Sequence, residues 1–129
     1  MKQEFYDLRI NTNGQRLYEF TNKIIELIKK NSFTNGILNL NIQHTSASLM
    51  IQENADPDVM KDMKNFFDKL VPMDNNYVHD AEGKDDMPAH IKSALTNSHL
   101  SLSIQKNRII LGTWQGLYLF EHRLESHTR

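Results

Sequence analysis

Asn41–Pro57, with the sequence NIQHTSASLMIQENADP, is the stretch that decides the fold. The apolar alternation of residues 38–42 enters it and stops at His44, after which three hydroxyl side chains follow closely. Alternation of apolar and polar residues predicts a β-strand with one buried face. The Asp56-Pro57 pair predicts a helix start, because Asp is a good N-cap and Pro fits the first helical turn. The stretch therefore predicts a strand, a polar corner, a second strand and a helix, in that order.

On its amino-terminal side the sequence predicts two short strands and a helix. Residues 6–10 alternate Tyr, Leu and Ile with polar residues, which is typical of a strand. Asn13-Gly14 predicts a hairpin turn, because both residues tolerate positive φ, and we expect residues 16–20 to form a strand that pairs back. Thr21 is a candidate cap for a helix with four Ile and Leu residues at helical spacing.

On the carboxyl-terminal side the sequence predicts two more helices and further strands. In chain order they are a helix from Pro57 to Pro72, a polar connection over residues 73–87, a short helix opened by Pro88, a strand with strict alternation over residues 100–104, a turn at Lys106-Asn107 and two apolar runs within residues 108–122.

Hairpin-type connections dominate this order of elements. They favour an α+β fold with a mainly antiparallel, sandwich-like sheet core and two to three helices. A chain of 129 residues suits one domain, residues 1–129, with one core. The connection over residues 73–87 is long for so small a domain, and such loops are usually functional or disordered.

The composition excludes several classes of function. The net charge is -1 and there is no stripe of Lys and Arg, so we expect no nucleic-acid partner. The absence of cysteine excludes disulfides, thiolate zinc sites and cysteine nucleophiles. No apolar run approaches the roughly 20 residues of a membrane span, and the first residues lack the apolar region of a secretory signal. We therefore expect a cytoplasmic protein with no membrane partner.

Histidines in two segments are candidate metal ligands. His79 and His90 flank the carboxylate-rich segment YVHDAEGKDDMPAH, and His44 comes from a separate strand. Three imidazoles that converge from separate segments would form a zinc-type site with an open fourth position. The spacing matches no compact metal motif, so the alternative is three histidines that lie on the surface or make ordinary hydrogen bonds.

Two further features have both a structural and a functional interpretation. Asp85 and Asp86 precede the Pro88 helix, where they either cap the helix or act as ligands or orienting carboxylates of a metal site. In GTWQG, Trp114 is either a core anchor or part of a ligand site. The glycines on both sides of it predict a bulge or a close backbone approach.

Four longer motifs carry a resemblance to a known family. QHTSASL, QENADPDV, HDAEGKDDMPAHIK and LGTWQGLYLFEHR resemble, in order and spacing, the YjbQ-type family, whose members are labelled secondary thiamine-phosphate synthases. The resemblance covers about residues 4–123. It implies an α+β domain that assembles as a homotrimer. It also implies a weak activity that joins a hydroxymethylpyrimidine group to a thiazole phosphate and releases pyrophosphate.

The resemblance also implies a set of site residues. The implied metal ligands are His44, His79 and His90, with zinc as the expected divalent ion and magnesium or manganese as alternatives. The implied catalytic residues are His44, Ser46, Glu53, Asp56, Glu82, Trp114 and Gln115.

Two departures from the family pattern affect these expectations. Relatives continue past the EHR motif into a final strand that residues 1–129 lack, so we expect an open sheet edge. Phe120 stands where some relatives have cysteine, so no thiol role carries over.

Three functions follow as hypotheses. The first is the thiamine-phosphate synthase activity. The second is a metal-dependent hydrolase or lyase of a small phosphorylated or carbonyl metabolite, because imidazole ligands suit zinc-type chemistry better than magnesium pyrophosphate chemistry. The third is a non-enzymatic module that binds a metal or metabolite.

Overall fold

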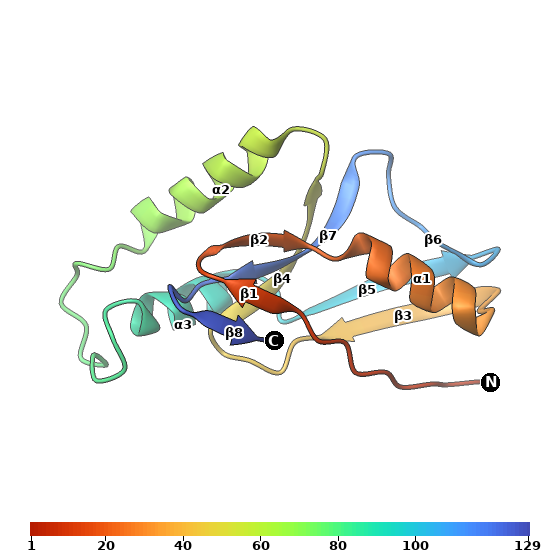
Figure 1. The fold of residues 1–129 in the computed structure, drawn as a ribbon, viewed down its shortest axis with the longest axis horizontal. Coiled ribbons are helices and arrows are strands. Elements are labelled where there is room, and N and C mark those ends of the chain that lie inside the picture. The colour runs from red at the N-terminus through yellow and green to blue at the C-terminus, as the bar shows by residue number, and fades with distance from the viewer.

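Antiparallel β-sheets and three helices form the α+β fold that the sequence predicts (Figure 1). The computed structural model describes residues 1–129. Its elements are β1 (Asn11–Asn13), β2 (Arg16–Glu19), α1 (Thr21–Asn31), β3 (Asn35–Asn41), β4 (Ala47–Glu53), α2 (Pro57–Leu70), α3 (Asp86–Leu95), β5 (His99–Gln105), β6 (Arg108–Ile109), β7 (Gln115–Glu121) and β8 (Ser126–Thr128).

Strand β7 lies at the centre of one of the two larger sheets. It pairs with β2 on one edge and with β4 on the other, while β5 lies between β3 and β6 in the second sheet. The β1–β8 pair forms a separate two-stranded ribbon. The two larger sheets are joined where the amide of Leu49 in β4 donates to the carbonyl of Asn97, 2.7 Å away, just before β5.

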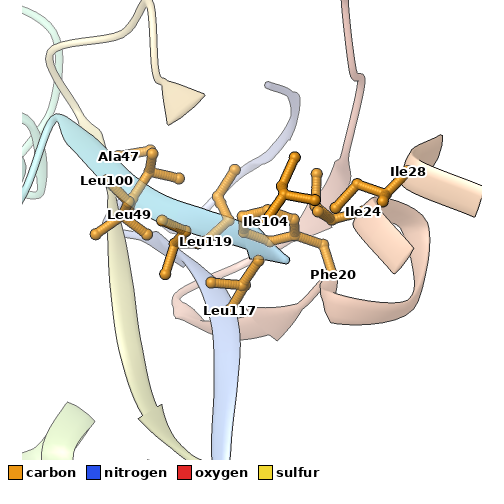
Figure 2. Packing of buried hydrophobic residues seen from close by; sticks show 10 residues of the cluster. Phe20, Ile24, Ile28, Ala47, Leu49, Leu100, Ile104, Leu117 and Leu119 are labelled. Atoms are coloured by element: carbon orange, nitrogen blue, oxygen red, sulfur yellow. The ribbon is translucent and has the colours of Figure 1, made fainter. Parts of the chain in front are cut away.

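The main core lies between α1 and the inner faces of the two larger sheets (Figure 2). Strand β5 buries every second residue, as its alternation predicts. Ile24 and Ile28 bury one face of α1, and Leu117 of β7 is fully buried against them. Each such side chain contributes roughly 1.5–3 kcal/mol through burial, so this layer fixes how the sheets face each other.

A smaller core lies on the other side of β7, beneath α2. Leu17, Tyr118 and Phe120 form its centre, and Phe67 of α2 meets Phe120 edge-on with ring centroids 5.5 Å apart. No residue of α2 is fully buried. This helix therefore covers the sheet without entering the main core.

The amino-terminal predictions need correction. Residues 6–10 form no strand, and only Ile10 exchanges backbone hydrogen bonds with a partner, Arg129. Gly14 has the positive φ of a turn, but β1 pairs with β8 and β2 with β7 instead of with each other. The physical reason is burial: β2 places Leu17 opposite Phe120 and against the smaller core, which a short exposed hairpin could not offer.

The predicted helices and the later turn agree with the structure, apart from their ends. Helix α2 begins at Pro57 as predicted, and the Asp56 carboxylate accepts from the Asp58 amide at 2.9 Å. Helix α3 begins two residues before Pro88, because a proline in the first turn loses no helical hydrogen bond. Lys106 and Asn107 both have positive φ in the turn between β5 and β6. None of the three helices combines the length and apolar character that a membrane-spanning helix needs.

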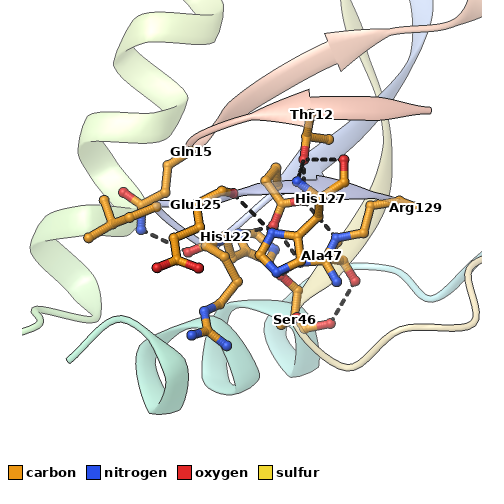
Figure 3. Close-up of polar contacts among 12 residues, drawn as sticks. Thr12, Gln15, Ser46, Ala47, His122, Glu125, His127 and Arg129 are labelled. Atoms are coloured by element: carbon orange, nitrogen blue, oxygen red, sulfur yellow. Dashed lines mark hydrogen bonds and ion pairs between the residues drawn. The ribbon is translucent and has the colours of Figure 1, made fainter. Parts of the chain in front are cut away.

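Two buried polar groups lie side by side at the carboxyl end of β7. The Glu121 carboxylate accepts from the Arg129 guanidinium at 2.5 and 2.6 Å and from the Thr12 hydroxyl at 2.9 Å. Figure 3 shows Thr12, His122 and Arg129 together in this region. Nε2 of His122, a residue that is 1% exposed, lies 2.9 Å from the Ser48 hydroxyl, while its Nδ1 has no partner. Burial, with a further contribution from Lys92, lowers the pKa of His122 to about 3.

The buried His122 predicts a loss of stability in mild acid. Its folded-state pKa lies below the unfolded value, so its contribution is complete above pH 6.5 and falls as the pH drops from there toward about 3. We expect this imidazole to add roughly 1.4 kcal/mol per pH unit to the pH dependence of the unfolding free energy in that range. Urea unfolding at pH 7, 6, 5 and 4 measures it.

The matched comparison is His122→Asn against the exposed His99→Asn. The pH dependence of the unfolding free energy is expected to become weaker in His122→Asn and to stay as in the wild type in His99→Asn. Equal slopes for the wild type and His122→Asn would show that the buried imidazole is not its source.

Candidate functional site

The first turns of α3 and the loop before it bring three potential metal ligands together. His79 comes from the loop, whereas Asp86 and His90 are four residues apart on one face of α3. One ligand atom from each lies within 4.8 Å of the other two. Nε2 of His79 is 2.6 Å from Oδ2 of Asp86, and Nε2 of His90 is 3.3 Å from the same oxygen. We call these three residues the His–Asp cluster.

The contact made by Nδ1 of His90 determines whether Nε2 of the same ring can accept a proton or bind a cation. Nδ1 lies 3.1 Å from the backbone carbonyl of Thr45, which can only accept, so Nδ1 carries the proton. In a neutral imidazole, Nε2 then has a lone pair, and that lone pair faces the Asp86 carboxylate. Two acceptors at 3.3 Å require a proton or a cation between them. A backbone carbonyl that fixes the imidazole in this way is the usual support of a metal-ligating histidine.

Arg123 holds the carboxylates of this corner in place. Its Nε donates to Asp85 at 2.9 Å, its Nη1 pairs with Oδ1 of Asp86, and its Nη2 donates to the carbonyl of Glu82 at 2.9 Å. Burial alone would raise the pKa of Asp86, but the hydrogen bond from His79 and the charge of Arg123 outweigh it and lower the pKa. Asp86 is therefore ionised, with Oδ2 left free to face the two imidazoles.

Asp85 does not cap the helix. It occupies the N-cap position of α3 but makes no side-chain capping bond. Its carboxylate instead accepts from Arg123 and from the amide of Leu124, 2.8 Å away. Burial works against these bonds, yet together they lower the pKa of Asp85. Side-chain capping by Asp85 is therefore wrong, while Asp86 lies in the first turn of α3, where a carboxylate favours the helix dipole and can also orient an imidazole.

His44 and Ser46 lie beyond the His–Asp cluster. His44 does not belong to the group of three ligands and stands instead beside Arg129 and Glu121. Burial and the charge of Arg129 lower the pKa of His44. The carbonyl of Ser46 accepts from the amide of His122 at 3.3 Å and from Arg129 at 3.4 Å. Within one chain, Asp86 takes the third position that the sequence assigned to His44.

Glu82 lies next to the cluster. Its carbonyl accepts from Arg123, whose guanidinium also pairs with Asp86, and the residue is exposed to solvent. Of the implied catalytic residues, Glu82 is therefore one that the structure brings to the His–Asp cluster.

The remaining implied residues gather at the opposite end of β4 and β7. Glu53, the last residue of β4, pairs with Gln115, the first residue of β7, and the amide of Asn54 donates to the carbonyl of Trp114 at 2.9 Å. Asp56 caps α2 just beyond them. Strand β4 spans seven residues, so this end lies about 20 Å from its start, near which His90 is anchored to Thr45.

Trp114 occupies a turn, so the predicted bulge is wrong. The amide of Gln115 donates to the carbonyl of Gly112, and the amide of Gly112 donates to the Gln115 side chain at 2.7 Å. The β4–β7 register is one-to-one throughout, and Trp114 is 62% exposed. The predicted close approach is found at Gly116, where a Cβ would lie 2.7 Å from a Glu19 carboxylate oxygen.

Of the two residues Asp86 and Arg123, the sequence leaves the role of the first open and gives no indication of the second. Asp86 is predicted, with Asp85, either to cap the helix or to act as a ligand or orienting carboxylate, and its i, i+4 spacing to His90 puts both on one helix face. Arg123 gave no local signal, because its partners lie 37 and 38 positions away in the chain. The arrangement offers two imidazoles and one carboxylate to a cation, on a solvent-facing corner with a fixed inner support.

Fold and site together define a small α+β protein of antiparallel sheets with a histidine- and carboxylate-lined corner at one sheet end. The chain belongs to the YjbQ family: residues 6–129 match the family model described as UPF0047 protein YjbQ-like. A UPF0047 protein from Synechocystis sp. is 49% identical over 123 residues, which are 95% of this chain and 84% of that protein. The UPF0047 protein YjbQ of Escherichia coli O157:H7 is 48% identical over 111 residues, 86% of this chain and 78% of that one.

Solved structures agree with the fold. An uncharacterised YjbQ/UPF0047 family protein from Clostridium acetobutylicum superposes with a TM-score of 0.84 at 30% identity, covering 95% of each chain. A conserved hypothetical protein from Thermus thermophilus has a TM-score of 0.78 at 31% identity and covers 95% of this chain and 98% of its own. The α+β prediction and the resemblance are thereby confirmed.

The contacts of Arg123 predict a cost for its removal. Arg123→Gln leaves two buried carboxylates without their cation, and we expect the unfolding free energy to fall by about 3 kcal/mol at pH 7. The measurement is urea unfolding, with the exposed Arg108→Gln as the matched control. A loss of the same small size in both variants would mean that Arg123 does not hold the corner together.

Proposed function

We propose that His79, Asp86 and His90 hold a divalent metal ion and that the protein is a metal-dependent hydrolase or lyase of a small phosphorylated or carbonyl metabolite. The observation that carries this proposal is the placement of His90 Nε2 3.3 Å from the Asp86 carboxylate, with His90 Nδ1 held by the Thr45 carbonyl. With a neutral imidazole, a cation between the two acceptors would turn a repulsive contact into two ligand bonds.

The donor set favours a transition metal over magnesium. Two imidazoles and one carboxylate are typical zinc ligands and also suit iron or manganese, whereas magnesium prefers oxygen ligands and retains its waters. Ligands about 2.1 Å from one ion lie roughly 3–4 Å from each other, and the candidate ligand atoms of the cluster all lie within 4.8 Å of one another. Zinc is therefore our first choice of ion.

The residues of the chain have separate roles in this proposal. A bound metal would supply Lewis-acid polarisation of a phosphoryl or carbonyl oxygen. Arg123 orients Asp86, and the carbonyl of Thr45 orients His90. Glu82, exposed and bound through its carbonyl to the arginine that pairs with Asp86, is our candidate for the base that takes a proton from an attacking water.

Thiamine-phosphate synthase activity is the second candidate. Lys84 and the first turn of α3 lie next to the cluster and support it, because cations and helix N-termini bind phosphate groups. This candidate also needs an aromatic platform for a heterocycle, and Trp114 is far from the cluster within one chain. Formation of thiamine phosphate from the two substrates by the metal-loaded protein would decide in its favour.

Metal binding by single variants tests the first proposal. We expect one zinc ion per chain, by mass spectrometry after reconstitution and dialysis. His79→Ala, His90→Ala and Asp86→Asn should each bind zinc at least about 100-fold more weakly, since loss of a supporting residue alone costs about 10–100-fold. His44→Ala and the exposed His99→Ala are the controls and should bind normally.

Three outcomes would contradict this assignment. No zinc in the wild type would mean that a proton, and not a metal, lies between His90 and Asp86. Full binding by His90→Ala would place the ion elsewhere. Loss of zinc in His44→Ala would make His44 a ligand, as the sequence first indicated.

We also propose that the protein assembles as a homotrimer, as the family resemblance implies. Strand β3 supports self-association: it is a sheet edge of seven residues without a charged side chain, and Ile37 on it is 72% exposed. Such an edge invites pairing with another chain.

The assembly is tested by light scattering. We expect three times the chain mass of 15.1 kDa for the wild type. Ile37→Lys should dissociate the assembly, whereas Val78→Lys, at an even more exposed apolar residue of the loop before α3, should not. A monomeric wild type at 50–100 μM (roughly the range in which weak interfaces are populated) would contradict the proposal.

A further inference from the structure

We propose that the loop before α3 forms the substrate pocket of the His–Asp cluster, and that the pocket takes a small hydroxylated metabolite with a single anionic group. This inference rests on the proposed function, because His79 belongs both to the cluster and to the wall of the pocket. It specifies the class of substrate more closely than the metal chemistry alone does.

The pocket is a cavity of about 350 Å³ that the loop makes with its own residues. The Tyr77 hydroxyl donates to the carbonyl of Pro72 at 2.8 Å, which closes the loop on one side. On the other side Gly83 has φ +109°, and its amide donates to the carbonyl of Asp80. Its lining is His79 with Met73, Asp74, Asn75, Asn76, Tyr77, Asp80, Gly83 and Lys84.

Several lining side chains are free to bind a ligand. Lys84 forms no ion pair, although carboxylates are abundant in this loop. The carboxylates of Asp74 and Asp80 and the side-chain amide of Asn76 make no hydrogen bond within the chain. These groups offer one positive charge for an anion, and two carboxylates and an amide for hydroxyl groups.

The same lining disfavours two other ligand classes. Its formal charge is negative, since two carboxylates outnumber one lysine, so a pyrophosphate would meet repulsion. Met73 and Tyr77 are the only apolar wall, which is too little to cover a flat heteroaromatic ring, because ring sites are mostly apolar. A monophosphate or carboxylate on a hydroxylated carbon chain carries less negative charge than pyrophosphate, can pair with the single lysine, and matches the polarity of the lining.

The position of His79 indicates how a ligand would be oriented in the pocket. Nε2 of His79 faces Asp86 in the cluster, while 47% of the side chain remains exposed beside the pocket. A ligand with its anionic group on Lys84 would therefore extend its hydroxylated carbons past His79 toward the cluster. The reacting carbonyl or phosphoryl oxygen would lie at that end.

Binding to the metal-free protein tests the pocket independently of catalysis. The probes are glycerol 3-phosphate, D-glycerate, glycerol, pyrophosphate and 4-amino-5-hydroxymethyl-2-methylpyrimidine, each titrated into labelled protein and followed by amide shifts in NMR spectra. We expect glycerol 3-phosphate or D-glycerate to bind best and to shift residues 73–84. Lys84→Gln should weaken that binding about ten-fold or more, as expected for loss of a charged hydrogen bond, and the exposed Lys106→Gln should leave it unchanged.

Other outcomes would overturn the proposal. Tighter binding of pyrophosphate or of the pyrimidine would indicate that the pocket binds the reactants of thiamine-phosphate synthesis instead. Shifts outside residues 73–84, or equal affinity in Lys84→Gln, would show that the pocket is not the binding site.

A failure of the metal proposal remains distinguishable from a failure of the pocket. Zinc binding and probe binding are measured separately on the wild-type protein. Zinc uptake without a response of residues 73–84 to glycerol 3-phosphate contradicts the pocket alone. Binding of glycerol 3-phosphate at residues 73–84 by a protein that takes up no zinc contradicts the metal proposal alone.

Discussion

The pairing of β7 with β4 is the constraint on which the rest of the structure depends. Its register places Ala47 opposite Glu121 at one end and Glu53 opposite Gln115 at the other. The carbonyl of Thr45 and the guanidinium of Arg123 thereby meet α3 at the same sheet end, one holding His90 and the other Asp86. A shift of one residue would turn every side chain of β4 to the opposite face, so the site and the core share one register.

Buried charge organises the carboxyl end of β7. Glu121 and Arg129 form one pair, and Arg123 with Asp85 and Asp86 forms another two positions away. Such pairs contribute little net stability, because desolvation offsets their attraction, yet removal of one partner is costly. Their effect here is to fix the direction of specific oxygen atoms. Oδ1 of Asp86 is held by Arg123, which leaves Oδ2 for the histidines.

The separation between the two sheet ends matters for function. The family motifs place polar residues at both ends of β4 and β7, but within one chain only the end near α3 collects imidazoles and carboxylates around a common point. Sequence and structure both establish the family. The names of the matched relatives give the family, UPF0047 or YjbQ, and no reaction. The chemistry is therefore argued from the cluster and its neighbouring pocket, because shared fold by itself does not define an activity.

The sequence by itself determined the elements whose signals are local. The alternation of β5, the Asp56-Pro57 start of α2 and the Lys106-Asn107 turn each depend on neighbouring residues only. It also indicated His79 and His90, through the carboxylate-rich segment between them. Tertiary structure alone decided that residues 6–10 stay outside the sheets, that Arg123 supports the site, and that Asp86 replaces His44 beside the two histidines. These outcomes depend on which strands pair and which charges become buried together, and both are set by contacts between residues far apart in the chain.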